Sequence, residues 1–101
     1  MTSDFTHLSR HHRDTLLQIF QHPASRNIAW HDVLSLLEAT GAVEERHDGK
    51  YHVHLGDNVQ VFIRPKHKDI DVQQVVDLRR IVTAEGYDAL VREMEGKGKE
   101  D

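Results

Sequence analysis

The stretch GKYHVHLGDNVQVFIRPKH (residues 49–67) is the most informative part of this chain about its architecture, because its apolar and polar residues alternate. Within 50–55, the odd-numbered residues are Tyr51, Val53 and Leu55, and the even-numbered residues are Lys50, His52 and His54; we call each such set one parity. A period of two residues is typical of a β-strand with one buried face. The turn formers Gly56-Asp57-Asn58 come next, and a second alternating run covers 58–64. We therefore predict a β-hairpin.

The second strand of this hairpin has apolar residues on both parities. One parity holds Val59, Val61 and Ile63, and the other holds Gln60, Phe62 and Arg64. If the three aliphatic residues face the core together with Val53 and Leu55, then His52, His54, Gln60, Phe62 and Arg64 face outward. A one-residue bulge in either strand would reverse part of this assignment.

A third strand and a helix are expected before the hairpin. VEERH (43–47) can form a strand, and its charges favour an edge position. Asp48-Gly49 is a strong signal for a two-residue hairpin loop to the next strand. Upstream, Trp30, Val33, Leu34 and Leu37 have helical spacing, and Gly41 stands where a helix C-terminus is expected.

The two ends of the chain also have helical patterns. FTHLSRHHRDTLLQIF predicts a helix over about 5–22 that Pro23 ends, followed by a turn over 23–27. Asp71 and Gln74 form a capping-box pattern that opens a helix over 72–85, which Gly86 ends. A short helix over 87–94 follows, and the charged tail GKGKED (96–101) is expected to be disordered.

These elements predict an α+β fold with an α-β-β-β-α core. We expect a three-stranded antiparallel sheet with helices on one face, an extra N-terminal helix and a short C-terminal helix. The corresponding ranges are 1–27 for the N-terminal helix and turn, 28–95 for the core, and 96–101 for the tail.

Composition excludes several classes of protein. The chain has 101 residues, a net charge of −4, nine histidines and no cysteine. Disulfides and thiolate metal sites are therefore impossible. The acidic balance disfavours strong nonspecific binding of nucleic acid. No apolar run is long enough to span a bilayer, and no signal-peptide core follows Met1, so we expect a cytoplasmic protein without a membrane partner.

Three stretches in the predicted core resemble the HicA toxins, small bacterial proteins that cleave RNA. They are LSLLEATGAVEER (34–46), a helix ending in glycine; GKYH (49–52), a Gly-x-x-His strand; and PKH (65–67), which precedes the closing helix LRRIVTAEGY (78–87). Together they cover somewhat more than half of the chain. The resemblance implies a fold like that of a double-stranded-RNA-binding domain, cleavage of messenger RNA without a metal or other cofactor, and neutralisation by a HicB-type antitoxin.

The resemblance also implies a site. His52 matches, within one residue, the catalytic histidine of the family, and a histidine can accept or donate a proton near neutral pH. Lys50, Arg64 and Lys66 are candidates for contacting phosphate. Phe62 could stack an unpaired base beside His54 and Arg64, unless the N-terminal helix buries it. His67 lies in a basic loop before a helix start, where anions are favoured.

Two other interpretations remain open at this point. His52 and His54 form a His-x-His pair that could hold a metal, with His47 or His67 as a third ligand, although solvated histidines are the more common case. The same fold could also bind RNA or a protein partner without catalysis. The acidic balance favours this second interpretation, as does Lys50, which stands where the family usually has serine after the hairpin glycine.

Overall fold

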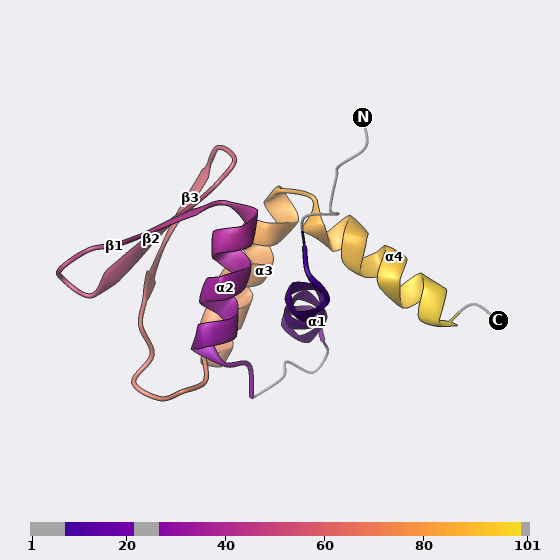
Figure 1. The fold of residues 1–101 in the computed structure, drawn as a ribbon, viewed down its shortest axis with the longest axis horizontal. Helices are drawn as coiled ribbons and strands as arrows, with labels where there is room; N and C mark the ends of the chain where they lie inside the picture. The colour runs from indigo at the N-terminus through magenta and orange to yellow at the C-terminus, as the bar shows by residue number, and fades with distance from the viewer. Residues whose placement is uncertain (1–7, 22–26, 100–101) are drawn as a thin grey trace.

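The computed structural model describes residues 8–21 and 27–99, which form four helices and three strands (Figure 1). The elements are α1 (Arg10–Ile19), α2 (Trp30–Thr40), β1 (Ala42–Glu45), β2 (Lys50–Leu55), β3 (Asn58–Ile63), α3 (Val72–Ala84) and α4 (Tyr87–Lys99). This order confirms the predicted α+β class and the predicted succession of helices and strands.

The helices cover one face of the sheet. The strands form an antiparallel sheet in the order β1-β2-β3. α2 contacts β1 and β2, and α3 contacts β3, so these two helices form a layer against the sheet. α1 contacts α2, α3 and α4, and it lies on the side of α2 and α3 away from the sheet (Figure 1). The N-terminal helix therefore leaves the second face of the sheet uncovered.

The register of the β2–β3 hairpin differs from the predicted one. Leu55 pairs with Asn58, so the loop has two residues, Gly56 and Asp57, and not three. Gly56 has a φ of 59°, as the first central residue of a type II′ turn does. Shortening a loop by one residue moves every side chain of the following strand to the opposite face.

The prediction that β3 faces the core through its aliphatic residues was therefore wrong. Phe62 pairs with Tyr51, which lies on the buried parity of β2, and Phe62 is 2% exposed. Val59, Val61 and Ile63 are 58%, 42% and 63% exposed. The assignment of β2 itself was right, because Tyr51, Val53 and Leu55 are all buried.

The β1–β2 loop is one residue longer than predicted. Glu45 pairs with Tyr51, and the N–H of Arg46 donates to the carbonyl of Lys50 at 2.8 Å. The loop therefore consists of 47–49 rather than Asp48-Gly49 alone. Gly49 has a φ of 86°, as expected of the last residue in a three-residue hairpin loop. β1 runs over Ala42–Glu45, so the predicted strand 43–47 was placed one to two residues too late.

The predicted capping box of α3 is present. The Asp71 carboxylate accepts from the N–H of Gln74 at 2.8 Å, and the Gln74 side chain accepts from the N–H of Asp71 at 3.2 Å. α1 is shorter than predicted, because the Ser9 hydroxyl caps its start and the helix ends at Ile19. Residues 5–7 and 22–26, which include Pro23, lie outside the described residues. α4 is longer than predicted and extends to Lys99.

Polar contacts join α1 to both helices of the inner layer. His11 Nε2 lies 2.9 Å from Oδ1 of Asp32, and His12 Nε2 lies 2.9 Å from Oγ of Ser35, both on α2. On α3, the guanidinium of Arg79 donates to the carbonyl of Ile19 at 2.6 Å and to that of Gln21 at 2.8 Å. These two carbonyls lie at the C-terminal end of α1, where helical carbonyls have no intrahelical partner.

Candidate functional site

The face of the sheet turned away from α2 and α3 is the candidate site, and we call it the outer face. Residues paired directly across antiparallel strands lie on the same face. Because Tyr51, Val53 and Leu55 point to the helices, the register assigns the alternate residues of all three strands to the outer face. These are Ala42 and Glu44 on β1, Lys50, His52 and His54 on β2, and Val59, Val61 and Ile63 on β3.

The middle strand supplies a row of basic and titratable groups. Lys50 and His54 are exposed, and His52 is partly buried between its neighbours. Alternate residues of a strand are about 6.6 Å apart, so the two imidazoles and the ammonium group can reach one bound molecule. The structure therefore brings His52, His54 and Lys50 together, as the alternation of β2 predicts.

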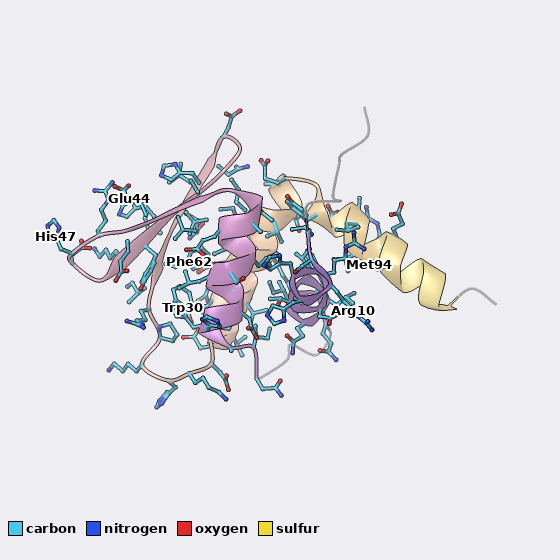
Figure 2. All side chains as sticks on the ribbon, in the orientation of Figure 1. Arg10, Trp30, Glu44, His47, Phe62 and Met94 are labelled. Atoms are coloured by element: carbon cyan, nitrogen blue, oxygen red, sulfur yellow. The ribbon has the colours of Figure 1, made fainter. Side chains whose placement is uncertain are left out.

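The two flanking strands differ in chemistry. Glu44 lies directly across from His52 on β1, and it also pairs with Arg46 at 3.1 Å. Val61 lies across from His52 on β3, and Val59 lies across from His54. The histidine row therefore runs between an acidic strand and an aliphatic strand. Figure 2 shows Glu44 and His47 at the end of the sheet that is remote from the helices.

Phe62 does not belong to this face, contrary to the prediction. It lies on the side of the sheet that faces α2, near Trp30 (Figure 2). Trp30 in turn packs edge-on against Tyr51, with ring centroids 5.3 Å apart. Phe62 is buried under α2 and α3 rather than under the N-terminal helix, and it is inaccessible to an RNA base.

The basic residues after β3 border a hollow that adjoins the outer face at Ile63. Arg64, Lys66 and His67 line a hollow of about 360 Å³ whose lining includes neither His52 nor His54. Asp69 and Asp71 line the same hollow, so its charges are mixed. The prediction that Arg64 shares an outward face with Phe62 is therefore wrong, because Phe62 is in the core and β3 ends at Ile63.

The loop that carries these residues is held in place at both ends. The side-chain N–H of Gln74 donates to the carbonyl of Ile63 at 2.7 Å, which ties the end of β3 to the start of α3. The N–H of Trp30 donates to the carbonyl of Lys68, and the N–H of Ile70 donates to the carbonyl of Ile28, both at 2.9 Å. The loop is thus a fixed part of the fold that joins the sheet to the starts of α2 and α3.

Sequence reasoning did not identify Glu44 or the exposed row on β3 as parts of the site. Both follow from strand register, which depends on the lengths of the two hairpin loops. A two-residue Gly56-Asp57 loop was the available signal for the β3 row, since glycine at the first central position is typical of a type II′ turn.

Within 8–21 and 27–99, no group of three or more His, Asp or Glu side chains is arranged to hold a metal ion. Among the same residues, no helix has the length and apolar content needed to cross a bilayer. Comparison with protein-family models, with curated proteins and with solved structures finds no match to this chain.

Proposed function

We propose that this chain is a HicA-like endoribonuclease that cleaves messenger RNA on the outer face of its sheet, in a bacterial cytoplasm and under the control of a HicB-type antitoxin. The observation that supports this proposal best is the row formed by Lys50, His52 and His54 on the outer face of β2. The α-β-β-β-α order of the core agrees with the resemblance to that family.

The row contains the groups that cleavage of RNA requires. One imidazole takes the proton of the ribose 2′-hydroxyl, and the oxygen then attacks the adjacent phosphorus. The bond from phosphorus to the 5′-oxygen breaks, and a protonated imidazole supplies the proton to that oxygen. The products are a 2′,3′-cyclic phosphate and a free 5′-hydroxyl. The Lys50 ammonium stabilises the negative charge of the pentacoordinate phosphorus.

We assign His52 as one of the two proton-transfer groups and His54 as the other. His52 occupies the central strand with neighbours on both sides, which restricts its orientation. His54 is more exposed and lies one step along the same face. Arg64, Lys66 and His67 border the neighbouring hollow, where they are available to bind the RNA strand beyond the cleaved bond.

A second candidate is a module that binds a protein partner without catalysis. The specific observation in its favour is the position of Glu44, because a carboxylate directly across from His52 repels phosphate. The exposed aliphatic residues of β3 also suit a protein surface better than a nucleic acid.

Cleavage of a mixed-sequence messenger RNA by the purified protein tests the proposal. We expect His52→Ala and His54→Ala to reduce the rate at least about 100-fold each. A transcript with 2′-deoxyribose at the cleaved position should stay intact, since the attacking hydroxyl is absent. End-group analysis should find cyclic phosphate, and chelation of divalent metals should leave the rate unchanged.

His31→Ala is the matched control, because His31 is an exposed histidine on α2, away from the outer face. Its rate should equal that of the unmodified protein. Equal cleavage by all four proteins would indicate a contaminating nuclease and contradict the assignment. Intact RNA with the unmodified protein, combined with binding that falls steeply with salt, would favour the module without catalysis.

A further inference from the structure

The edge of β3 that faces away from β2 lacks the residues that usually protect the edge of a sheet. β3 has β2 as its one sheet neighbour in the described part of the chain, so its other side ends the sheet. Proteins commonly protect such an edge with charged residues, proline or a covering element. β1, the opposite edge, carries Glu44 and Glu45. β3 reads NVQVFI and has no charge, proline or glycine.

The hairpin register determines which backbone groups this edge presents. A two-residue loop makes Leu55 and Asn58 a hydrogen-bonded pair, and hydrogen-bonded pairs then alternate along the hairpin. The backbone N–H and C=O groups of Val59, Val61 and Ile63 consequently point away from β2. Their side chains are also the exposed ones on the outer face. The backbone groups that β2 leaves unpaired and the exposed aliphatic side chains therefore come from the same three residues, with the Ile63 carbonyl bonded instead to the Gln74 side chain.

A six-residue segment of this composition tends to pair with another strand, because its β-propensity is high and none of its own residues is charged. A hollow of about 240 Å³ runs beside this edge, between Val61 and Ile63 on β3 and Gln73 and Asp77 on α3. The backbone of β3 is thus accessible from the side as well as from the outer face.

We infer that β3 pairs with β3 of a second copy of this chain, antiparallel and about a twofold axis at Val61. In this register Val61 lies across from Val61 of the second copy, and Val59 lies across from Ile63. All three outward-pointing residues of each strand then form hydrogen-bonded pairs. The six aliphatic side chains lie together on one face of a continuous six-stranded sheet.

The charges that flank β3 favour this antiparallel arrangement. The strand is preceded by the acidic Asp57 and followed by the basic Arg64 and Lys66. The proposed register therefore places Asp57 of one copy beside Arg64 and Lys66 of the other, and the symmetry repeats this contact. A parallel pairing would instead bring like charges together at both ends. The self-complementarity of the edge thus identifies a second copy as the partner.

The carbonyl of Ile63 already accepts a hydrogen bond from Gln74, and it retains a second lone pair for the added strand. A single pair of short strands is a small interface, so we expect a reversible dimer with a dissociation constant of about 10 µM. The outer-face histidines stay uncovered in such a dimer. The dimer does use Arg64 and Lys66, which the proposed function assigns to RNA, so dimerisation is tested in the absence of RNA.

Sedimentation equilibrium without RNA, from about 1 µM to about 500 µM, tests this inference. We expect a monomer–dimer equilibrium in the unmodified protein. Val61→Lys and Val61→Glu each place two like charges across the twofold axis, so each should weaken the dimer at least about tenfold. An equimolar mixture of the two variants should restore the dimer, because lysine then faces glutamate.

Val76→Lys is the matched control, because Val76 on α3 is 39% exposed and Val61 is 42% exposed. Val76→Lys should dimerise normally. Circular dichroism checks that each variant is folded. Amide hydrogen exchange of the unmodified protein gives a measurement that needs no variant: the amides of Val59, Val61 and Ile63 should exchange more slowly as concentration rises.

Several results would overturn the inference. A monomer at every concentration would do so, as would a dimer that Val61→Lys leaves intact or that Val76→Lys disrupts equally. Failure of the mixed variants to associate would reject the twofold axis at Val61. Exchange at the three amides that does not depend on concentration would reject β3 as the contact.

Discussion

Replacing Phe62 with alanine should destabilise the protein far more than replacing its neighbour Val61. Phe62 is 2% exposed and pairs with the buried Tyr51, so its removal leaves a cavity between the sheet and the helices. A substitution of this kind costs about 3–5 kcal/mol. Val61 is 42% exposed on the outer face, and Val61→Ala should change the free energy of unfolding by about 0.5 kcal/mol or less.

Urea denaturation followed by circular dichroism measures both changes. The protein should be held near 1 µM, below the expected dissociation constant of about 10 µM, so that dimerisation does not contribute. In a domain of this size, each kcal/mol lowers the melting temperature by about 4–8 °C. Phe62→Ala should therefore melt about 12–40 °C below the unmodified protein.

The reverse order of the two effects would refute the register of β3. A three-residue Gly56-Asp57-Asn58 loop would bury Val61 and expose Phe62, so Val61→Ala would then be the more damaging change. If Phe62→Ala does not fold, Phe62→Leu keeps the comparison available. It should lower the free energy of unfolding by about 1–2 kcal/mol, still more than Val61→Ala.

Two further predictions concern the turns and the pH dependence. Gly56→Ala should lower the free energy of unfolding more than Gly49→Ala does. Both glycines have a positive φ, which costs alanine about 1–2 kcal/mol. A Cβ at Gly56 also meets the Glu85 carboxylate, which accepts a hydrogen bond from Asn58. Denaturation that ranks Gly49→Ala as the worse change would contradict this reading. Burial, and secondarily the charge of Glu85, raises the pKa of Tyr87 above 10, so the folded state holds that proton more tightly than the unfolded state. The resulting stability is complete below pH 10 and is lost as pH rises through the folded pKa. Tyr87→Phe should therefore flatten the decline of stability above pH 10, and an unchanged slope would contradict the shift.

Sequence patterns predicted the elements that depend on local interactions. The capping box of α3 involves residues three apart, and the alternation of β2 has apolar residues on one parity only. β3 has apolar residues on both parities, so its pattern alone does not say whether Phe62 or Val61 is buried. The answer depends on one residue of loop length and on the need to fill the space beside Trp30 and Tyr51.

The residues of the candidate site likewise include some that a local pattern predicts and some that depend on contacts between strands. The positions of Lys50, His52 and His54 on one face follow from the alternation of a single strand, and the structure places them there. The position of Glu44 depends on pairing between strands, and that of Arg64 depends on where β3 ends. Tertiary contacts set the register and the ends of strands, and the periodicity of a single segment gives no information about those contacts.

Arg79 on α3 constrains where α1 ends. Its guanidinium binds the main-chain carbonyls of Ile19 and Gln21, so it recognises the position of the helix end and not the identity of any side chain there. The Gln21 side chain is consequently free to vary. An inserted or deleted residue is a different matter, because each residue turns the helix by about 100° and shifts it by about 1.5 Å. The contact with Arg79 therefore constrains the length of α1, in addition to the constraint that burial places on Leu16 and Ile19 in its last turn.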